Sequence, residues 1–493
     1  MFSTSQLRQK ILDAAWKLFA QRGFASVSMA DIARECDASL GEVFAQFPRK
    51  NELVFALYDS LALQLEERLV ELPDGDLATR FRAAMRWKIE SLVPHRAVLG
   101  AIFEEMARPE TDLGVMSEAQ NGTRARVRAV FALAAWGARD RPPDAAMPEL
   151  IRHLYRLHLG LIFLWFRAPR SYSLALGALS SLLKIGAPSL ENGAISRALR
   201  ASDAWLSRKI EPATASAELP RQILARIFRG RRLQNRCECA ARPCETCLAL
   251  HLARVEQFVW RGAPIEMVLP AFPGKSPNRA KVLGDSPDLA EELALRHLET
   301  LCRDIAALYP PGARITICSD GHVFSDLVGL SDAQVSNYGA GIREIIARHE
   351  LKNLDFFDLS DIFAAPDYAF IRQNLLPKWC ENPSALRERV HNFPAHRALF
   401  DGLHRFLFED ALFLEPQKTR SQLKRQTKTL AYEVMARSNA WGRLVGAHFP
   451  NALRLSIHPQ PAHSEKIGVC FGPASDDWVT PWHGVALLRD QDF

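Results

Sequence analysis

Apolar runs in the second half of the chain lie next to residues that can carry a charge or move a proton. A lysine and a serine follow the first run, an aspartate and a histidine follow the second, and single histidines stand beside two later ones. In chain order these residues are Lys275, Ser276, Asp320, His322, His458 and His483. Histidine and aspartate can exchange protons near neutral pH, and a loop lysine beside a serine suits an oxyanion. The pattern predicts a ligand site built from loops that follow strands.

The elements that must position these residues alternate between strand and helix patterns, which is typical of a parallel sheet with covering helices. The expected strands are Ile265–Leu269, Ile315–Cys318, Asp355–Leu359 and Arg454–Ile457, with a further β-rich run at Lys466–Phe471, and the expected helices are Ala290–Leu308, Val335–His349 and Ser421–Val445. The carboxyl ends of such strands share one crevice, where ligands bind. No GxGxxG follows either of the first two strands, so we do not expect a nicotinamide cofactor.

The expected helix Ser421–Val445 carries cations one turn apart, at Lys424 and Lys428, with Arg425 beside them. A cationic helix face next to a cleft suits a phosphate or a carboxylate. The alternative is a solvated basic helix, which we favour for Lys418 and Arg420.

Length and composition set wider bounds. The 493 residues predict two or three domains at roughly 150 residues each, and 48% hydrophobic content is sufficient for sizeable cores. A net charge of +6 does not demand a polyanionic partner. The longest apolar run, Leu159–Phe166, is far shorter than the ~20 residues of a spanning helix, and no secretory signal is visible. We therefore expect a soluble, cytoplasmic protein with no membrane contact, and nine cysteines agree with a reducing compartment.

Residues 1–60 predict three short helices. The first spans Leu7–Ala20, the second follows a Ser28/Asp31 capping pattern, and the third begins at Ser39 after a tight turn. Through RGF, SMADIA, SLGEVFAQF and KNEL the segment resembles the helix-turn-helix domain of TetR-type repressors. That resemblance implies DNA binding through Ser28, Ser39, Gly41, Phe44, Gln46 and Lys50.

Two features set this segment apart from that family. Phe44 and Gln46 stand where tyrosine and histidine are usual, and the seven basic residues of positions 1–60 are balanced by seven acidic ones. Neutralisation of phosphates is the main source of affinity for duplex DNA. The alternative is therefore a domain that only supports dimerisation.

Residues 61–210 show helical periodicity almost throughout and resemble the regulatory domain of the same repressors. The resemblance implies a homodimer formed by the last helices, Ser171–Leu183 and Ile195–Lys209, and a ligand pocket of unknown specificity. His153, His158 and Trp165 are candidates for that pocket, although ordinary packing explains them as well. Residues 211–219 form a Pro/Ala/Ser linker.

Four cysteines fall within eleven residues, at Cys237, Cys239, Cys244 and Cys247. Short CxC and CxxC loops can each deliver two thiolates to zinc, although the quartet lacks the longer spacer of zinc ribbons. A structural zinc site is one interpretation, and four reduced thiols in an arginine-rich loop are the other.

Residues 220–493 resemble the isonitrile synthase family, whose members are also called pyoverdine/dityrosine biosynthesis proteins. The matching blocks are FPGKSPN, KVLG, SPDLAE, SDGHVFSDLVG, AYEVMARSNAW, RLSIHPQ, EKIGV and TPWHGVA. The resemblance implies conversion of the amino group of tyrosine or tryptophan into an isonitrile. The added carbon would come from ribulose 5-phosphate, with no metal or redox cofactor.

Such a reaction needs a phosphate clamp, a carboxylate clamp and proton shuttles. The candidates at the phosphate end are Lys275, Arg279 and Lys281 beside Ser276, with Lys424 and Arg425 in reserve, and the candidate shuttles are Asp320, His322, His458 and His483. Lys275 could instead form a Schiff base with the ketose.

The sequence as a whole predicts a multidomain chain. An all-α helix-turn-helix and a helical regulatory domain precede an α/β Rossmann-like synthase domain. The rival interpretation is a transcriptional regulator whose synthase-like half is an inactive sensor.

Overall fold

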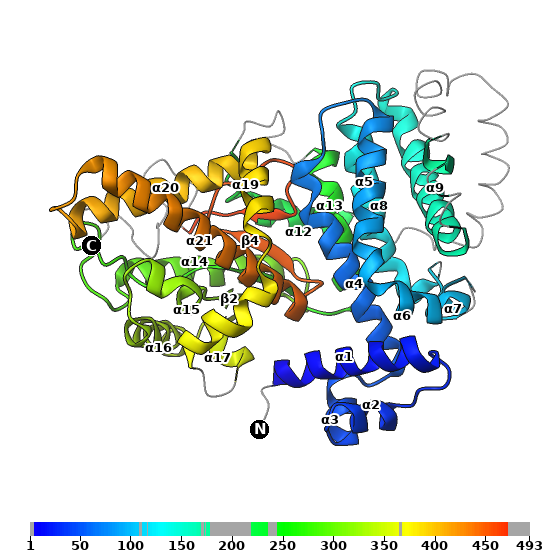
Figure 1. Ribbon diagram of the computed structural model, residues 1–493, viewed down its shortest axis with the longest axis horizontal. Helices are drawn as coiled ribbons and strands as arrows, with labels where there is room; N and C mark the ends of the chain where they lie inside the picture. Colours follow the sequence, from blue (N-terminus) through cyan, green and yellow to red (C-terminus); the bar gives the residue numbers. More distant parts are fainter. Residues whose placement is uncertain are drawn as a thin grey trace. The chain divides into compact units, whose positions relative to one another are not determined.

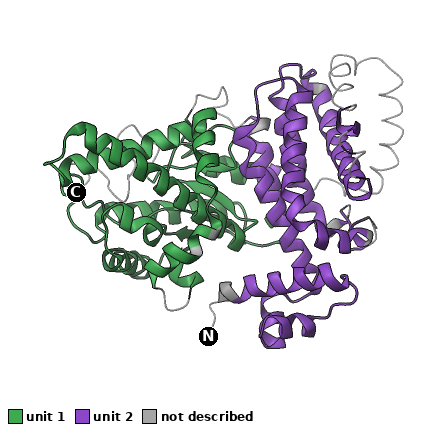
Figure 2. Cartoon of the chain, viewed as in Figure 1, with its two compact units in different colours: residues 1–6, 222–242, 258–493 green, residues 7–221, 243–257 purple. Residues whose placement is uncertain are grey.

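The computed structural model describes residues 4–107, 111–115, 117–168, 172, 174–177, 218–234, 244–363 and 367–471. The chain divides into two compact units (Figure 2). Unit 2 comprises 7–221 and 243–257, and unit 1 comprises 1–6, 222–242 and 258–493. None of the described helices combines the length and apolar character that crossing a membrane requires.

Unit 2 begins with the predicted three-helix arrangement: α1 (Thr4–Arg22), α2 (Met29–Glu35) and α3 (Leu40–Gln46). Capping boxes start the last two helices. The Ser28 hydroxyl accepts from the Asp31 amide at 3.1 Å, and the Ser39 hydroxyl accepts from the Glu42 amide at 3.2 Å. These caps satisfy amides that a helix start leaves unpaired, so the local sequence fixes where both helices begin.

The remaining helices of unit 2 form a bundle around one apolar core. They are α4 (Lys50–Glu67), α5 (Leu77–Leu92), α6 (Arg96–Ala101), α7 (Phe103–Ala107), α8 (Asn121–Trp136) and α9 (Met147–Arg167). Helix α8 contacts α4, α5 and α9, and Phe81, Val130 and Phe131 are buried at its centre. The helical prediction for this region is therefore confirmed over its described part.

A buried charge cluster lies in this bundle. Arg126 of α8 binds Glu66 of α4 through two nitrogens, at 2.8 and 2.9 Å, and Arg254 binds the same carboxylate. Arg254 belongs to α13 (Glu245–Arg261), a helix far along the chain. Burial alone would raise the pKa of Glu66, but the two guanidinium charges outweigh burial and hold that pKa at about 2. The part of α13 that contains Arg254 is thereby anchored in unit 2.

Unit 1 is built on a small parallel sheet. Its strands are β1 (Ile265–Leu269), β2 (Ala313–Cys318), β3 (Leu354–Phe357), β4 (Leu453–Ser456) and β5 (Lys466–Gly468), in the order β3-β2-β1-β4-β5. Every pairing is parallel, with Met267 opposite Ile315 on one side and Leu453 on the other. The predicted strands are confirmed to within a few residues. The chain adds β2 and β3 on one side of β1 and then β4 and β5 on its other side. Where the strand order reverses in this way, a ligand-binding crevice is expected, here at the carboxyl ends of β1 and β4.

Helices cover both faces of the sheet (Figure 1). Those of unit 1 include α12 (Glu218–Phe228, which starts in unit 2), α14 (Leu289–Ala306), α15 (Gly321–Phe324), α16 (Asp332–Arg348), α17 (Leu359–Ile362), α18 (Tyr368–Phe370), α19 (Pro383–Asn392), α20 (Pro394–Leu414) and α21 (Arg420–His448). On one face, Val268 and Cys318 share a core with Trp441 of α21, and the Trp441 indole donates to the Cys318 carbonyl at 3.1 Å. On the other face, α14 contacts β2 and β3. The helices α17–α20 were not predicted, although α20 is one of the longest.

Candidate active site

A cavity of about 170 Å³ lies at the carboxyl ends of β1, β2 and β4. Its polar lining includes Lys275, Asp320, Arg454, Ser456, His458 and Lys466. The first two follow β1 and β2, and the others belong to β4, β5 and the segment between them. The strand ends therefore bring together polar groups that are almost 200 residues apart in sequence.

Two glycines allow the loops after β1 and β2 to meet. A Cβ atom on Gly321 would lie 2.1 Å from the Pro273 carbonyl oxygen, so a larger residue would push the loops apart. Gly274 has a φ of +135°, which side chains with a Cβ rarely adopt. The Ser319 hydroxyl also donates to the Phe272 carbonyl at 2.9 Å. These contacts place Asp320 and Lys275 on one cavity.

Lys275 is buried and neutralised. Its ammonium lies 2.9 Å from Asp288 and 2.6 Å from Glu291, the two carboxylates of the capping box that starts α14. The Tyr338 hydroxyl donates to Glu291 at 3.0 Å. Burial raises the pKa of Glu291 to about 7, although the Lys275 charge opposes the rise. Lys275 therefore locks the loop after β1 onto the first turn of α14 while it also lines the cavity.

The proton-carrying groups of the cavity have displaced pKa values. Burial raises the pKa of Asp320 to about 7. Burial, together with the charges of Arg232 and Lys466, lowers the pKa of His458 to about 4. At neutral pH His458 is a neutral imidazole, whereas Asp320 can both accept and release a proton.

The sequence predictions missed several polar residues of the cavity, among them Arg454, Ser456 and Lys466, of which Arg454 is the most deeply buried. It is 2% exposed in β4, lies 3.5 Å from Glu465 and donates to the Gly442 carbonyl at 3.0 Å. The available signal was a single arginine inside the apolar run Ala452–Ile457, because a buried strand rarely holds a charge without a function or a partner.

Most of the remaining lining is apolar. Helix α20 contributes Leu399, Leu403 and Phe406, and helix α21 contributes Val434 and Met435. A cavity with cations at the strand ends and an apolar wall opposite can hold a molecule that has an anionic end and a hydrophobic end.

Comparison with known proteins identifies this region. Residues 255–493 match the model of the pyoverdine/dityrosine biosynthesis protein family. The L-tryptophan isonitrile synthase AmbI1 of Fischerella ambigua is 44% identical over 273 residues, which cover 55% of this chain and 86% of the relative. The chain belongs to the pyoverdine/dityrosine biosynthesis family.

Two further comparisons agree with this assignment. The L-tyrosine isonitrile synthase of Pseudomonas aeruginosa is 40% identical over 288 residues, covering 57% of this chain and 88% of the relative. The crystal structure of PvcA from Pseudomonas aeruginosa superposes with a TM-score of 0.51 at 41% identity, covering 54% of this chain and 88% of that one. At the other end of the chain, residues 11–57 match the model of bacterial regulatory proteins of the tetR family.

Within the pyoverdine/dityrosine region, some predicted residues do not line the cavity. Arg279 pairs with Asp285 at 2.7 Å, and Lys281 pairs with Asp410 at 2.9 Å. Lys424 lines a separate, open hollow with Arg405 and Arg420, and Arg425 is exposed.

His322 is buried outside the cavity. It stacks on Tyr368 at 3.6 Å, and its Nε2 lies 3.2 Å from the Ser336 hydroxyl. His483 is outside the described residues, so its predicted role stays a prediction.

Ser276 lines the cavity, but its hydroxyl is already engaged. It donates to Asp410 of α20 at 2.9 Å, and the Asn278 amide group donates to the same carboxylate at 3.2 Å. Together with Lys281 these bonds hold the Lys275 loop against α20. Ser276 therefore helps to position the loop that carries Lys275.

The predicted DNA-binding residues of the tetR-family segment divide into two groups. Gly41 and Phe44 lie on the exposed face of α3, and Phe44 is 43% exposed. Ser28 and Ser39 serve as helix caps, and Gln46 is half-buried.

Lys50 also makes internal contacts. Its ammonium donates to the carbonyls of Phe24 and Val27, at 2.9 and 3.0 Å, and lies over the Phe24 ring. Substitution of Lys50 would therefore disturb the domain itself.

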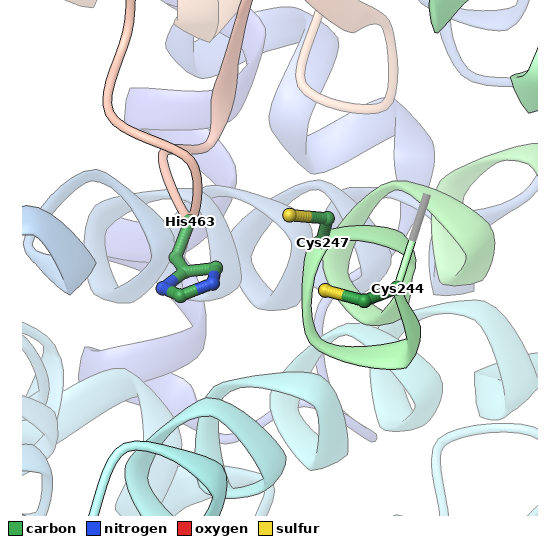
Figure 3. A group of neighbouring side chains, drawn as sticks. All are labelled: Cys244, Cys247 and His463. Atoms are coloured by element: carbon green, nitrogen blue, oxygen red, sulfur yellow. The ribbon is translucent and has the colours of Figure 1, made fainter. Parts of the chain in front are cut away.

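Cys244 and Cys247 lie at the beginning of α13 (Figure 3). Cys247 is buried and Cys244 is half-buried. The two cysteines are thus part of a helix start rather than of the predicted loop. Cys237 and Cys239 lie outside the described residues.

Proposed function

We propose that the pyoverdine/dityrosine region is an isonitrile synthase for an aromatic L-amino acid, tyrosine or tryptophan, with ribulose 5-phosphate as the carbon donor and no metal or redox cofactor. One observation carries this proposal. The cavity joins cations, a carboxyl group that titrates near neutral pH and an apolar wall at the end of a parallel sheet. Its strand order also supports a Rossmann-like interpretation.

The lining suggests how the two substrates lie. The phosphate faces Arg454 and Lys466 at the ends of β4 and β5, where Ser456 adds a hydroxyl. The aromatic side chain lies against Phe406 and Met435 of the apolar wall. In this orientation the phosphate is bound by Arg454, Lys466 and Ser456, which were not among the candidate residues predicted from the sequence.

Asp320 is the proposed proton shuttle. The reaction requires amine addition to a ketone, loss of water, enolisation and carbon–carbon cleavage with loss of phosphate. A carboxyl group with a pKa of about 7 can take a proton in one step and return it in another. His458, neutral at that pH, can accept a hydrogen bond from the substrate.

The direct test incubates the purified full chain with ribulose 5-phosphate and either L-tyrosine or L-tryptophan, followed by mass spectrometry for the isonitrile acid. Arg454→Met is expected to raise KM for the ketose phosphate strongly, and the exposed Arg279→Met serves as the matched control. No product from either amino acid, under conditions in which the Pseudomonas aeruginosa synthase is active, would favour the inactive-sensor alternative.

We also propose that the tetR-family segment binds DNA as a homodimer. The family match and the two capped helices support it, with Gly41 and Phe44 on the open face of α3. Phosphate contacts must compete with internal ion pairs, since Lys17 pairs with Glu35 and Arg49 pairs with Glu52. We therefore expect weak binding with steep salt dependence.

A gel shift with the full chain tests DNA binding. A fragment that ends at residue 210 would lack Arg254 and leave the Glu66 cluster incomplete. Phe44→Glu adds a charge to the exposed face of α3 and should abolish binding to the region upstream of the protein's own gene. Equal affinity of the wild type for that region and for random DNA would leave dimerisation as the remaining role.

A further inference from the structure

Unit 2 contains a second cavity, of about 90 Å³, between α4, α5, α8 and α9. Most of its wall is apolar and aromatic, with Phe163 and Phe166 from α9 and Tyr58 from α4. Of the three pocket candidates that the sequence suggested, His158 lines this cavity. The proposed synthase chemistry makes no use of it.

Lys88 of α5 is the unusual residue of this wall. It is 7% exposed, and no described residue forms a hydrogen bond or an ion pair with its ammonium. Burial lowers the pKa of Lys88 to about 8, and no carboxylate among the described residues opposes the shift. A charged ammonium in a mostly apolar wall is costly when no carboxylate of the described residues pairs with it. An anion bound in the cavity would supply the missing negative charge.

Two further polar side chains of the cavity, Gln120 and His158, indicate what kind of ligand it can bind. Gln120 is 3% exposed, and its amide nitrogen is buried with no hydrogen-bond partner in the described chain. It is a second donor, suited to share a carboxylate with Lys88. His158 donates through Nδ1 to the Tyr155 carbonyl, which leaves Nε2 as an acceptor. An indole N–H or a phenol O–H would satisfy that acceptor.

The described wall of this cavity also lacks an acidic side chain. Among the described residues that line this cavity there is no aspartate or glutamate. An amino acid carries an α-ammonium group, which would enter beside the Lys88 ammonium with no carboxylate to pair with it. The cavity therefore favours an aromatic carboxylate whose α-substituent is uncharged.

We propose that this cavity binds an aryl-propanoate anion through Lys88 and Gln120 and excludes the corresponding amino acid. The isonitrile acid has this chemistry, since its ammonium has become a neutral isonitrile. That the natural ligand is the product of the same chain rests on the proposed function, whereas the ligand class rests on the cavity alone. Unit 2 would then bind the product of the synthase region and not its amino-acid substrate.

Calorimetric titration of the full chain with 3-(indol-3-yl)propanoate and with L-tryptophan tests this selectivity. Lys88→Met should weaken binding of the propanoate on the order of 10- to 100-fold, as expected for loss of a charge-assisted hydrogen bond. The exposed Lys17→Met is the matched control in the same unit. His458→Ala identifies any binding at the synthase cavity. Gln120→Leu, with a smaller expected loss, provides a second variant if Lys88→Met does not fold.

Equal binding of the propanoate by the wild type and Lys88→Met would overturn the inference. So would tryptophan binding that Lys88→Met removes. Isonitrile formation is measured on the same preparations. An inactive synthase with Lys88-dependent binding intact would overturn the proposed function alone, and loss of that binding overturns this inference whether or not the synthase is active.

Discussion

Two buried lysines show how differently the two units treat a charge. Lys275 of unit 1 is surrounded by Asp288 and Glu291, and Tyr338 completes the network. Lys88 of unit 2 is almost as deeply buried, and the described structure offers its ammonium no carboxylate. The first lysine is part of the scaffold of its site, because its charge is already neutralised. The second lysine leaves a charge for a ligand to neutralise.

The same contrast applies to two carboxyl groups whose pKa values are displaced. Glu66 is neutralised by two arginines, and its pKa is held at about 2. Asp320 forms no ion pair with any of the described residues, and burial raises its pKa to about 7. Glu66 holds helices together and Asp320 lines a cavity, whereas Lys275, although neutralised, does both. Perturbed groups that line cavities are the stronger functional candidates.

The largest expected effect is on catalysis. Asp320→Asn should lower isonitrile formation about 10²- to 10⁴-fold, the range typical of a lost acid–base group. Because the carboxylate must be ionised to accept a proton, wild-type kcat/KM should rise as pH increases through about 7. That limb should disappear in Asp320→Asn. A pH profile that keeps the limb in the variant would separate Asp320 from proton transfer.

The two lysines can be compared directly by making the same substitution, lysine to methionine, at each position. Lys275→Met should lower the free energy of unfolding by about 3–5 kcal/mol, because Glu291 and Asp288 lose their partner in a buried site. Activity should fall ~10²-fold or more. Lys88→Met should not lower the free energy of unfolding, since it removes a charge that no carboxylate of the described residues compensates. Urea unfolding of both variants measures the difference, and equal destabilisation would contradict the comparison.

The Lys88 charge should also appear in the pH dependence of stability. The pKa of Lys88 is lowered to about 8 in the folded protein and is near 10.5 when unfolded. Between these values the unfolded chain binds more protons, so the wild-type free energy of unfolding should rise with pH, by roughly 3 kcal/mol from this group. The difference between wild type and Lys88→Met isolates the contribution. A difference that does not change with pH would show that folding does not lower the pKa of Lys88.

A smaller effect is expected where one of two cations is removed. Arg254→Met leaves Glu66 with Arg126, so the free energy of unfolding should fall by about 2 kcal/mol. Hydrogen exchange should show that the turns of α13 around Arg254 are the segment most affected. Arg261→Met, at the C-terminal end of the helix, is the control. No change in α13 would mean that Arg254 does not anchor this helix.

The smallest effect is expected at the four cysteines, where removal of zinc should change only local proteolysis. If the thiolates of Cys244 and Cys247 are neutralised by zinc, elemental analysis should find about one zinc per chain. A chelator should then increase proteolysis within residues 230–250 before the sheet unfolds. Cys244→Ser should abolish the metal content and Cys470→Ser should not. Metal-free protein with unchanged proteolysis would leave four reduced thiols.

Much of this architecture follows from local sequence. Capping residues fixed the starts of α2 and α3, and apolar runs located the strands, because both signals act between near neighbours. Proline and glycine marked the loop that carries Lys275. The two family resemblances were also readable from short blocks, and both are confirmed. The alternation of strands and helices was sufficient to predict a parallel sheet.

Only the tertiary structure decided which charges are in use. Arg279 and Lys281 looked as suitable as Lys275, yet they pair with Asp285 and Asp410 outside the cavity. Arg454, in the middle of an apolar run, was not predicted, yet it lines the cavity together with Lys275 and Lys466. The free energy of a charge depends on burial and on partners that are distant in sequence, as with Arg254 and Glu66, 188 positions apart. Sequence therefore supplied the groups, while folding determined which were neutralised and which were left facing a cavity.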